Sequence, residues 1–300
     1  MSTRIKVAVA GATGYSGIEL VRLLGRHPDV EIRRLTSEQY AGKRLSEVYP
    51  SFRGRRDALL EPLDGAKLGE DVDVVFTALP HGTAASTVLR VLDSKARVVD
   101  LSADFRFRDA DVFRHWYGDH PAPALLSEAV YGIPEFSRER VRRARIVAVP
   151  GCYPTGALFG LLPLVRSGSV GDGNIVIDAK SGASGAGRGA RTDLLFCEVG
   201  ENVRAYGVGS HRHGPEIEQE FRLAGGRGSV LFTPHLLPIR RGILTTLYVP
   251  LREGANPERE YAAAYTSEPF VQLLGNDVFP DVRDVRSTND VQIGWTVHRS

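Results

Sequence analysis

A cysteine set between glycine and proline residues is the side chain best placed for chemistry in this sequence. Cys152 lies in Val149-Pro150-Gly151-Cys152-Tyr153-Pro154-Thr155-Gly156, after the apolar run 146–149 and before the helical pattern 157–165. At a turn from a strand into a helix, a thiol faces unpaired backbone N–H groups and the positive end of the helix dipole, which favour the thiolate. We therefore predict that Cys152 is a nucleophile. A small, buried, inert thiol is the alternative.

Four polar side chains gather at the predicted start of another helix, where Pro215 suits the first turn. A histidine there, His211 or His213, would serve as a general acid or base because its unperturbed pKa lies near neutral pH. Arg212 would clamp a carboxylate, and Glu216 would orient an imidazole. Helix caps and surface ion pairs are the alternative for each of these residues.

Glycines punctuate the turn after the first predicted strand, which reads Gly11-Ala12-Thr13-Gly14-Tyr15-Ser16-Gly17 and opens a helical pattern. Such glycines allow a tight turn and let backbone N–H groups approach a pyrophosphate at the helix N-terminus. The spacing is a looser variant of the GxGxxG fingerprint, and a turn that merely packs is the alternative. The predicted dinucleotide contacts are Gly11, Thr13, Gly14, Tyr15, Ser16 and Gly17.

The end of the second predicted strand bears on the choice of nicotinamide cofactor. An acidic residue there would bind the ribose hydroxyls of NAD. Here the sequence reads Leu35-Thr36-Ser37-Glu38-Gln39, and Lys43 and Arg44 follow. Hydroxyls and nearby cations suit a 2′-phosphate better, so we predict NADP(H), with Ser37 as a contact. Glu38 is the feature that favours NAD.

A loop of small residues between Lys180 and Arg188 follows a strand-like run. It offers backbone N–H groups, hydroxyls and two cations, which together would cradle a phosphate. We predict that Ser181 and Gly182 contact the cofactor and that Arg188, like Arg212, contacts the substrate. A flexible surface loop is the alternative.

Apolar runs alternate with helical patterns in the first half, as in βαβ units of a parallel sheet. Strands are predicted at 4–10, 30–35, 73–79, 97–101 and 145–149, and helices at 14–26 and 83–92. The aromatic-rich stretch 102–137 is predicted to be a structured excursion. We predict a Rossmann-type, doubly wound α/β domain at 1–150 that binds NADP.

The pattern of strand-like and helical runs changes after Cys152. Longer strand-like runs occupy 174–180, 229–237, 243–251 and 291–297, with helical patterns at 215–223 and 257–265. We predict a second, α+β domain at 151–300 with a mixed or antiparallel sheet, which would hold the catalytic and substrate-binding residues and the oligomerisation surface. Cys152 would then lie at the domain seam, where ligand clefts usually form.

Composition excludes several classes of protein. The 300 residues are 42% hydrophobic, which is enough for a large core. No run reaches the ~18 apolar residues of a membrane helix, and no signal peptide precedes the first strand, so we expect a soluble, cytoplasmic protein without a membrane partner. Cys152 and Cys197 lack metal-ligand spacing, which predicts no metal site. A net charge of +2 gives no reason to invoke nucleic acid.

Taken together, these segments resemble the N-acetyl-gamma-glutamyl-phosphate reductase family, NADP-dependent enzymes of arginine biosynthesis. The likeness extends over nearly the whole length. It includes the glycine turn, 79–82 (LPHG), 101–106 (LSADFR), 131–135 (YGIPE), 150–155 (PGCYPT), the loop after Lys180, 211–213 (HRH) and 232–235 (FTPH). The cysteine and SADFR segments are specific, whereas many dehydrogenases share the glycine turn.

The resemblance implies that Cys152 attacks a small-molecule acyl phosphate, that phosphate leaves, and that NADPH reduces the resulting thioester to an aldehyde. His213 would be the general acid-base, supported by His211 and Glu216. The resemblance also implies cofactor contact at Pro80, substrate binding by Arg106, and a homodimer or homotetramer.

The sequence departs from the family at its end. The family continues past the last strand with an Asn-Leu-x-Lys-Gly helix that returns to the cofactor domain, whereas this sequence stops at Ser300. We expect fewer contacts to the nicotinamide and exposed apolar surface on the first domain. An inactive, truncated remnant that retains only the fold and binding is therefore one alternative.

A second alternative is the related reductase of lysine biosynthesis, whose aminoadipyl phosphate is held on a carrier protein. Tyr153-Pro154 after the cysteine favours the arginine enzyme. Aspartate-semialdehyde dehydrogenase shares the chemistry, but its characteristic cysteine surroundings are not present.

Overall fold

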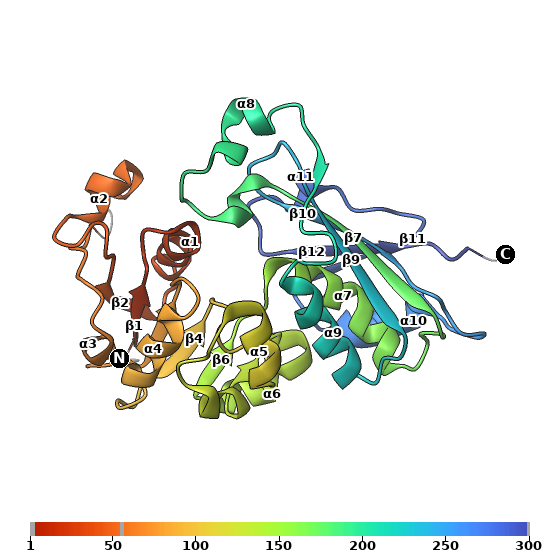
Figure 1. The fold of residues 1–300 in the computed structure, drawn as a ribbon, viewed down its shortest axis with the longest axis horizontal. Coiled ribbons are helices and arrows are strands. Elements are labelled where there is room, and N and C mark those ends of the chain that lie inside the picture. The colour runs from red at the N-terminus through yellow and green to blue at the C-terminus, as the bar shows by residue number, and fades with distance from the viewer. Residues whose placement is uncertain (1–3, 55–56, 299–300) are drawn as a thin grey trace. The chain divides into compact units, whose positions relative to one another are not determined.

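The computed structural model describes residues 4–54 and 57–298. The chain divides into two units, Met1–Pro150 and Gly151–Ser300, which appear from red to yellow-green and from green to blue in Figure 1. Each unit has its own sheet and its own helices.

The described part of the first unit is built on a parallel sheet with strand order β2-β1-β3-β4-β6-β5. This is the predicted doubly wound architecture, and the prediction is confirmed. The strands are β1 (Ile5–Ala10), β2 (Val30–Leu35), β3 (Val74–Thr77), β4 (Arg97–Asp100), β5 (Val130–Tyr131) and β6 (Ile146–Ala148). The helices are α1 (Tyr15–Leu24), α2 (Leu45–Val48), α3 (Gly65–Leu68), α4 (Thr83–Val91), α5 (Ala110–Tyr117) and α6 (Pro134–Arg143).

Both faces of this sheet are covered, because successive side chains of a strand point to opposite sides. Ala8 and Ala10 of β1 belong to one hydrophobic cluster, and Val9 between them belongs to another. Two apolar faces explain why the strand reads as a nearly continuous hydrophobic run rather than an alternating one.

The predicted excursion at 102–137 is structured. It contains α5, whose first turn is capped because the Asp109 carboxylate accepts the N–H groups of Asp111 and Val112. The helix itself was not predicted from the sequence. The stretch also contains the short strand β5.

The second unit is built on a mixed sheet, as predicted, with strand order β10-β7-β9-β8. β7 and β9 are parallel, while β10 and β8 run antiparallel to their neighbours. The strands are β7 (Asn174–Ser181), β8 (Arg204–Ala205), β9 (Ser229–Leu236) and β10 (Ile243–Tyr248), with a separate pair β11 (Val271–Asn276) and β12 (Val291–Trp295). The helices are α7 (Cys152–Arg166), α8 (Phe196–Val199), α9 (His213–Leu223), α10 (Pro257–Tyr265) and α11 (Val282–Val285). In Figure 1, α7 and α9 lie against one face of the four-stranded sheet.

A proline inside α7 is compensated by a tyrosine from α10. Pro163 has no N–H, so the Phe159 carbonyl loses the bond that residue i+4 normally donates. The Tyr265 hydroxyl, on a side chain that is 1% exposed, donates to that carbonyl over 2.6 Å. Tyr261 donates in the same way to the Gly160 carbonyl, 2.7 Å away, which keeps its ordinary helical partner.

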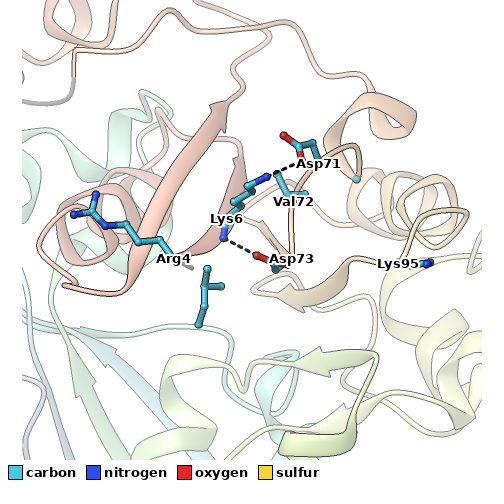
Figure 2. A pocket seen from close by; sticks show the side chains of 8 residues that line it. Arg4, Lys6, Asp71, Val72, Asp73 and Lys95 are labelled. Atoms are coloured by element: carbon cyan, nitrogen blue, oxygen red, sulfur yellow. Dashed lines mark hydrogen bonds and ion pairs between the residues drawn. The ribbon is translucent and has the colours of Figure 1, made fainter. Parts of the chain in front are cut away.

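A hollow of about 660 Å³ lies at the amino ends of β1 and β3 in the first unit. Figure 2 shows that Lys6 is held between two acids: its Nζ contacts Asp71 and its backbone N–H donates to Asp73, while Arg4 and Lys95 stand nearby. Ligands of open α/β sheets bind beyond the carboxyl ends of the strands, so this hollow is not where a cofactor is expected.

We expect Tyr265→Phe to destabilise the protein more than Tyr261→Phe. Only the first substitution removes a hydrogen bond from a buried carbonyl that has already lost its helical donor, which costs about 1–3 kcal/mol and lowers the melting temperature by a few degrees. Thermal unfolding of the two variants checks this. Equal losses would show that the Phe159 carbonyl does not depend on Tyr265.

Candidate active site

The glycine turn between β1 and α1 requires glycine at two positions, Gly11 and Gly17. Gly11 has φ +78°, and a Cβ there would lie 2.4 Å from the Ala78 carbonyl oxygen. A Cβ on Gly17 would lie 2.1 Å from the Gly11 carbonyl oxygen. Around Gly14 the nearest atom to such a Cβ is 3.7 Å away, and no side chain caps α1. The turn therefore fits a dinucleotide pyrophosphate, since it leaves room beside first-turn N–H groups that lack helical partners.

Two hydroxyls lock the turn to the end of β2. Thr13 and Ser37 are both buried, and their side-chain oxygens are 2.7 Å apart. The Tyr49 hydroxyl donates to the Thr13 carbonyl over 2.8 Å. Ser37 is only 4% exposed, so it supports the turn from beneath, and direct contact between Ser37 and a cofactor phosphate stays a prediction.

Glu38, the acid that would favour NAD, accepts a hydrogen bond from the protein backbone. Glu38 Oε1 accepts the backbone N–H of Leu63 over 2.6 Å. Lys43 and Arg44 are exposed, and the Lys43 ammonium lies 5.9 Å from the centre of the Tyr40 ring. Two exposed cations thus lie beyond β2, together with the exposed Glu38.

The strand order brings the turn after β3 beside the glycine turn. The order reverses between β1 and β3, and ligands of such sheets bind at that switch point. The close approach of Gly11 to Ala78 places the two turns in contact. Pro80, predicted from the family resemblance, is exposed in the second of these turns, and Tyr15 and Ser16 are exposed at the start of α1.

Cys152 is the first residue of α7 and its thiol is exposed, as expected of a nucleophile at a strand-to-helix turn. Gly151 precedes it in an extended conformation without a side-chain cap. The backbone N–H of Gly151 donates to the fully buried Glu216 carboxylate over 2.8 Å. Glu216 therefore fixes the backbone beside the thiol.

His213 opens α9 directly over the same backbone. A Cβ built on Gly151 would lie 2.6 Å from His213 Nε2, so glycine is required there for the imidazole to approach the cysteine segment. Gly151 was not singled out from the sequence, although a glycine before a predicted nucleophile was visible. Within the second unit, the structure thus brings together Cys152, His213 and Glu216.

His211 supports His213 through the backbone. Its Nδ1 accepts the His213 N–H over 3.1 Å, which requires an unprotonated Nδ1. Burial, with a smaller effect of the neighbouring Arg212 charge, lowers the pKa of His211 to about 4. His211 is therefore neutral near pH 7.

Two tyrosines beside the cysteine were given no role in the site from the sequence, although Tyr153 was noted as a family marker. Tyr153 is buried, and its hydroxyl is 2.8 Å from that of Tyr206. Both rings stand edge-on to His211 at 5.6 Å. Burial raises the pKa of both hydroxyls, and the nearby Cys152 charge adds to the rise. Tyr206 lies in the irregular segment beside β8, and nothing in the local sequence marked it.

The small-residue loop after β7 packs against the turn at 239–242. Ser181 and Gly182 are buried, and a Cβ on Gly182 would lie 2.8 Å from the backbone nitrogen of Arg241. The Lys180 ammonium pairs with Asp178 over 2.6 Å, so one predicted phosphate-binding cation already has an anionic partner. The cofactor contacts predicted for Ser181 and Gly182 stay predictions.

The three arginines predicted to bind substrate differ in exposure. Arg188 and Arg212 are exposed in the second unit. Arg106 is buried in the first unit, where its guanidinium donates to the carbonyls of Val149 and Leu101, each over 2.9 Å. Arg106 thus ties the end of β6, three residues before Cys152 in sequence, to the loop after β4.

Across residues 4–54 and 57–298, no group of three or more His, Cys, Asp or Glu side chains is arranged to hold a metal ion. In the same ranges, every helix falls short of the length and apolar character needed to cross a bilayer.

Solved structures share the fold. An aspartate semialdehyde dehydrogenase II from Vibrio cholerae, complexed with ASA, aligns over 97% of this chain and 87% of its own with a TM-score of 0.72 and 18% identity. An aspartate semialdehyde dehydrogenase with NADP from Candida albicans aligns over 97% and 89% with a TM-score of 0.72 and 16% identity. At these identities the likeness concerns the fold alone.

Family models and curated relatives are more specific. Residues 6–144 match the semialdehyde dehydrogenase NAD binding domain, which indicates a nicotinamide cofactor, and residues 152–300 match the semialdehyde dehydrogenase dimerisation domain. Relatives named N-acetyl-gamma-glutamyl-phosphate reductase include those of Citrifermentans bemidjiense, 50% identical over 98% of this chain and 86% of the relative, and Azotobacter vinelandii, 48% identical over 98% and 86%. The chain therefore belongs to the semialdehyde dehydrogenase family and, within it, to the N-acetyl-gamma-glutamyl-phosphate reductases.

Proposed function

We propose that this chain reduces N-acetyl-L-glutamyl 5-phosphate to N-acetyl-L-glutamate 5-semialdehyde in arginine biosynthesis, with Cys152 as the nucleophile and NADPH as the reductant. The observation that carries the proposal is the arrangement of an exposed thiol at the start of α7, with His213 over the adjacent Gly151 and Glu216 bonded to it. The curated relatives carry the name of this reaction, which favours it over the carrier-linked aminoadipyl alternative.

In the first half of the reaction, His213 takes the proton of the Cys152 thiol, and the thiolate attacks the acyl carbon. The bond between that carbon and the phosphate oxygen breaks, phosphate leaves with the electron pair and takes up the proton, and an acyl thioester remains on Cys152. Arg188 and Arg212, which are exposed, are proposed to attract the anionic groups of the substrate, and Arg106 is retained as a predicted contact.

When bound, the reduced nicotinamide supplies a hydride to the thioester carbon. His213, reprotonated from solvent after phosphate has left, then stabilises the oxygen of the tetrahedral adduct by donating a hydrogen bond to it. Collapse of the adduct breaks the carbon–sulfur bond, releases the aldehyde and restores the Cys152 thiolate. First-turn N–H groups of α1 and α7 would face the cofactor phosphates and the thiolate, respectively.

The preference for NADPH over NADH is supported by the end of β2. One oxygen of the Glu38 carboxylate accepts the Leu63 N–H, and the exposed Lys43 ammonium offers positive charge to a 2′-phosphate, while the Arg44 guanidinium also lies 3.9 Å from the Asp57 carboxylate. We propose a cytoplasmic location on the grounds that the chain has only two cysteines, neither in a disulfide, and that its relatives are biosynthetic enzymes.

The second unit is proposed to form a homo-oligomer through the sheet face that α7 and α9 do not cover. A Cβ on Gly156 of α7 would approach Thr245 of β10, so alternate residues such as Tyr248 face the other way. Tyr248 and Leu231 are the register partners of Val176 on its two sides, so the three side chains share one face of the sheet. Tyr248 is 60% exposed and Leu231 is 50% exposed. Such an exposed apolar row is typical of a protein interface.

The proposed reaction is tested in reverse, as the phosphate-dependent reduction of NADP⁺ by N-acetylglutamate semialdehyde. Cys152→Ser should reduce the rate at least ~10³-fold because no thioester can form. Cys197→Ser, which alters the other exposed free cysteine, is the matched control and should leave the rate unchanged. Repeating the assay with NAD⁺ tests the cofactor preference. Activity that persists in Cys152→Ser, or that needs no phosphate, would rule out the mechanism.

His211 is expected to act as a neutral acceptor rather than a proton carrier. Its pKa falls from 6.5 to about 4 on folding, so its contribution to stability is complete above pH 6.5 and is lost as the pH falls towards 4. His211→Asn keeps an acceptor in place of Nδ1 but does not titrate. It should flatten the fall in melting temperature between pH 7 and pH 4.5 and leave the pH profile of kcat in place.

His213→Asn should lower kcat about 10²–10⁴-fold. A shifted kcat profile in His211→Asn would assign the proton to His211.

Tyr248→Asp should weaken self-association about tenfold or more, because a buried charge would replace an apolar contact. Leu223→Asp at the end of α9, which changes a residue that is 52% exposed, is the matched control. Light scattering over a dilution series measures the mass of each variant. An unchanged association constant for Tyr248→Asp would place the interface elsewhere.

A further inference from the structure

The turn between β3 and α4, residues 78–82, forms one wall of the cofactor crevice if the proposed function holds. It contacts the glycine turn, because a Cβ on Gly11 would approach Ala78 and lie 3.2 Å from Leu79 Cδ2. Its shape is unusual, with Gly82 at φ +78° just before α4 begins. This conformation of the turn must be stabilised by neighbouring groups.

The Asp104 carboxylate holds it from below. Asp104 is fully buried, and its two oxygens lie 2.9 and 2.8 Å from the Gly82 nitrogen, whose N–H they accept. Oδ2 also accepts the Ala85 N–H over 2.8 Å. A carboxylate that accepts backbone N–H groups forms strong, charge-assisted hydrogen bonds.

A second bond runs in the opposite direction between the same two segments. The Ala103 N–H donates to His81 Nδ1 over 3.1 Å. The loop after β4 therefore bonds to two successive residues of the turn: the Asp104 carboxylate accepts the Gly82 N–H, and the Ala103 N–H donates to His81.

A buried polar chain keeps Asp104 itself in place. The Asp104 N–H donates to Ser102 Oγ over 3.0 Å, and Ser102 Oγ donates to Asp100 over 2.6 Å. Thr77 at the end of β3 also donates to Asp100, over 2.6 Å. Burial raises the pKa of Asp100 to about 6. A satisfied network of this kind is rigid, because any displacement leaves a buried polar group without a partner.

We propose that Asp104 is a positioning residue for the cofactor, which holds the β3–α4 turn in the shape that receives the nicotinamide dinucleotide. The proposal rests on the proposed function and assigns a task to the SADFR segment beyond that of Arg106. The competing explanation is that Asp104 only caps α4, since its carboxylate accepts N–H groups at the start of that helix, and has no effect on ligand binding.

Direct titration of the dinucleotide, followed by fluorescence well below the melting temperature, tests the proposal. Asp104→Asn replaces one acceptor oxygen with a donor and should raise the dissociation constant of NADPH about tenfold. Asp109→Asn is the matched control, because Asp109 caps α5 through two backbone N–H groups in the same unit. It should leave that constant unchanged, and because Asn caps a helix about as well as Asp it should change the melting temperature little.

A lower melting temperature with unchanged affinity in Asp104→Asn would reduce Asp104 to a cap and overturn the proposal, whereas failure of the unmodified chain to bind dinucleotide would overturn the proposed function as well. If Asp104→Asn does not fold, the exposed His81 gives the same information. His81→Asn keeps an acceptor at the Nδ1 position and should bind NADPH normally, while His81→Gln displaces it and should bind more weakly. The reverse order would overturn the proposal.

Discussion

The hydrogen bond between the Gly151 N–H and the Glu216 carboxylate is the constraint on which the candidate active site depends. It joins groups 65 residues apart and links the start of α7, which carries Cys152, to α9, which carries His213. Glu216 is fully buried, and a buried carboxylate without partners would be costly, so the bond stabilises the arrangement as well as setting it. The position of His213 adds a second constraint, glycine at 151, because any Cβ would displace the imidazole.

The first unit follows a comparable principle at the carboxyl ends of its strands. The polar side chains there are buried and point back to backbone groups, as Asp104 does to Gly82 and Arg106 does to Val149. These residues shape the turns that a ligand would meet, while the turns themselves remain backbone and glycine. A specific motif in sequence can thus encode the support of a site rather than its contacts.

Much of the fold could be predicted because its elements are long and periodic. The ranges predicted for the second strand, 30–35, and for the helix 257–265 match β2 and α10 residue for residue. The helix α5 was missed because its apolar face is short and lies within an aromatic-rich stretch, although Asp109 and Asp111 carry a capping signal. β11 was missed because Gly275, at φ +97°, interrupts the strand pattern and shifts its register with β12.

The candidate site was predictable in residue type but not in pairing. Glu216 was expected to orient an imidazole, and the bond observed is to backbone; Lys180 was expected to attract phosphate, and its partner is Asp178. The two histidines show why such pairings escape local reasoning. His211 and His213 are chemically identical and two residues apart, yet burial and the Arg212 charge lower the pKa of the first, whose Nδ1 accepts the backbone N–H of the second. Only the tertiary structure separates an imidazole that accepts a backbone N–H at the helix start from one that overlies the cysteine segment.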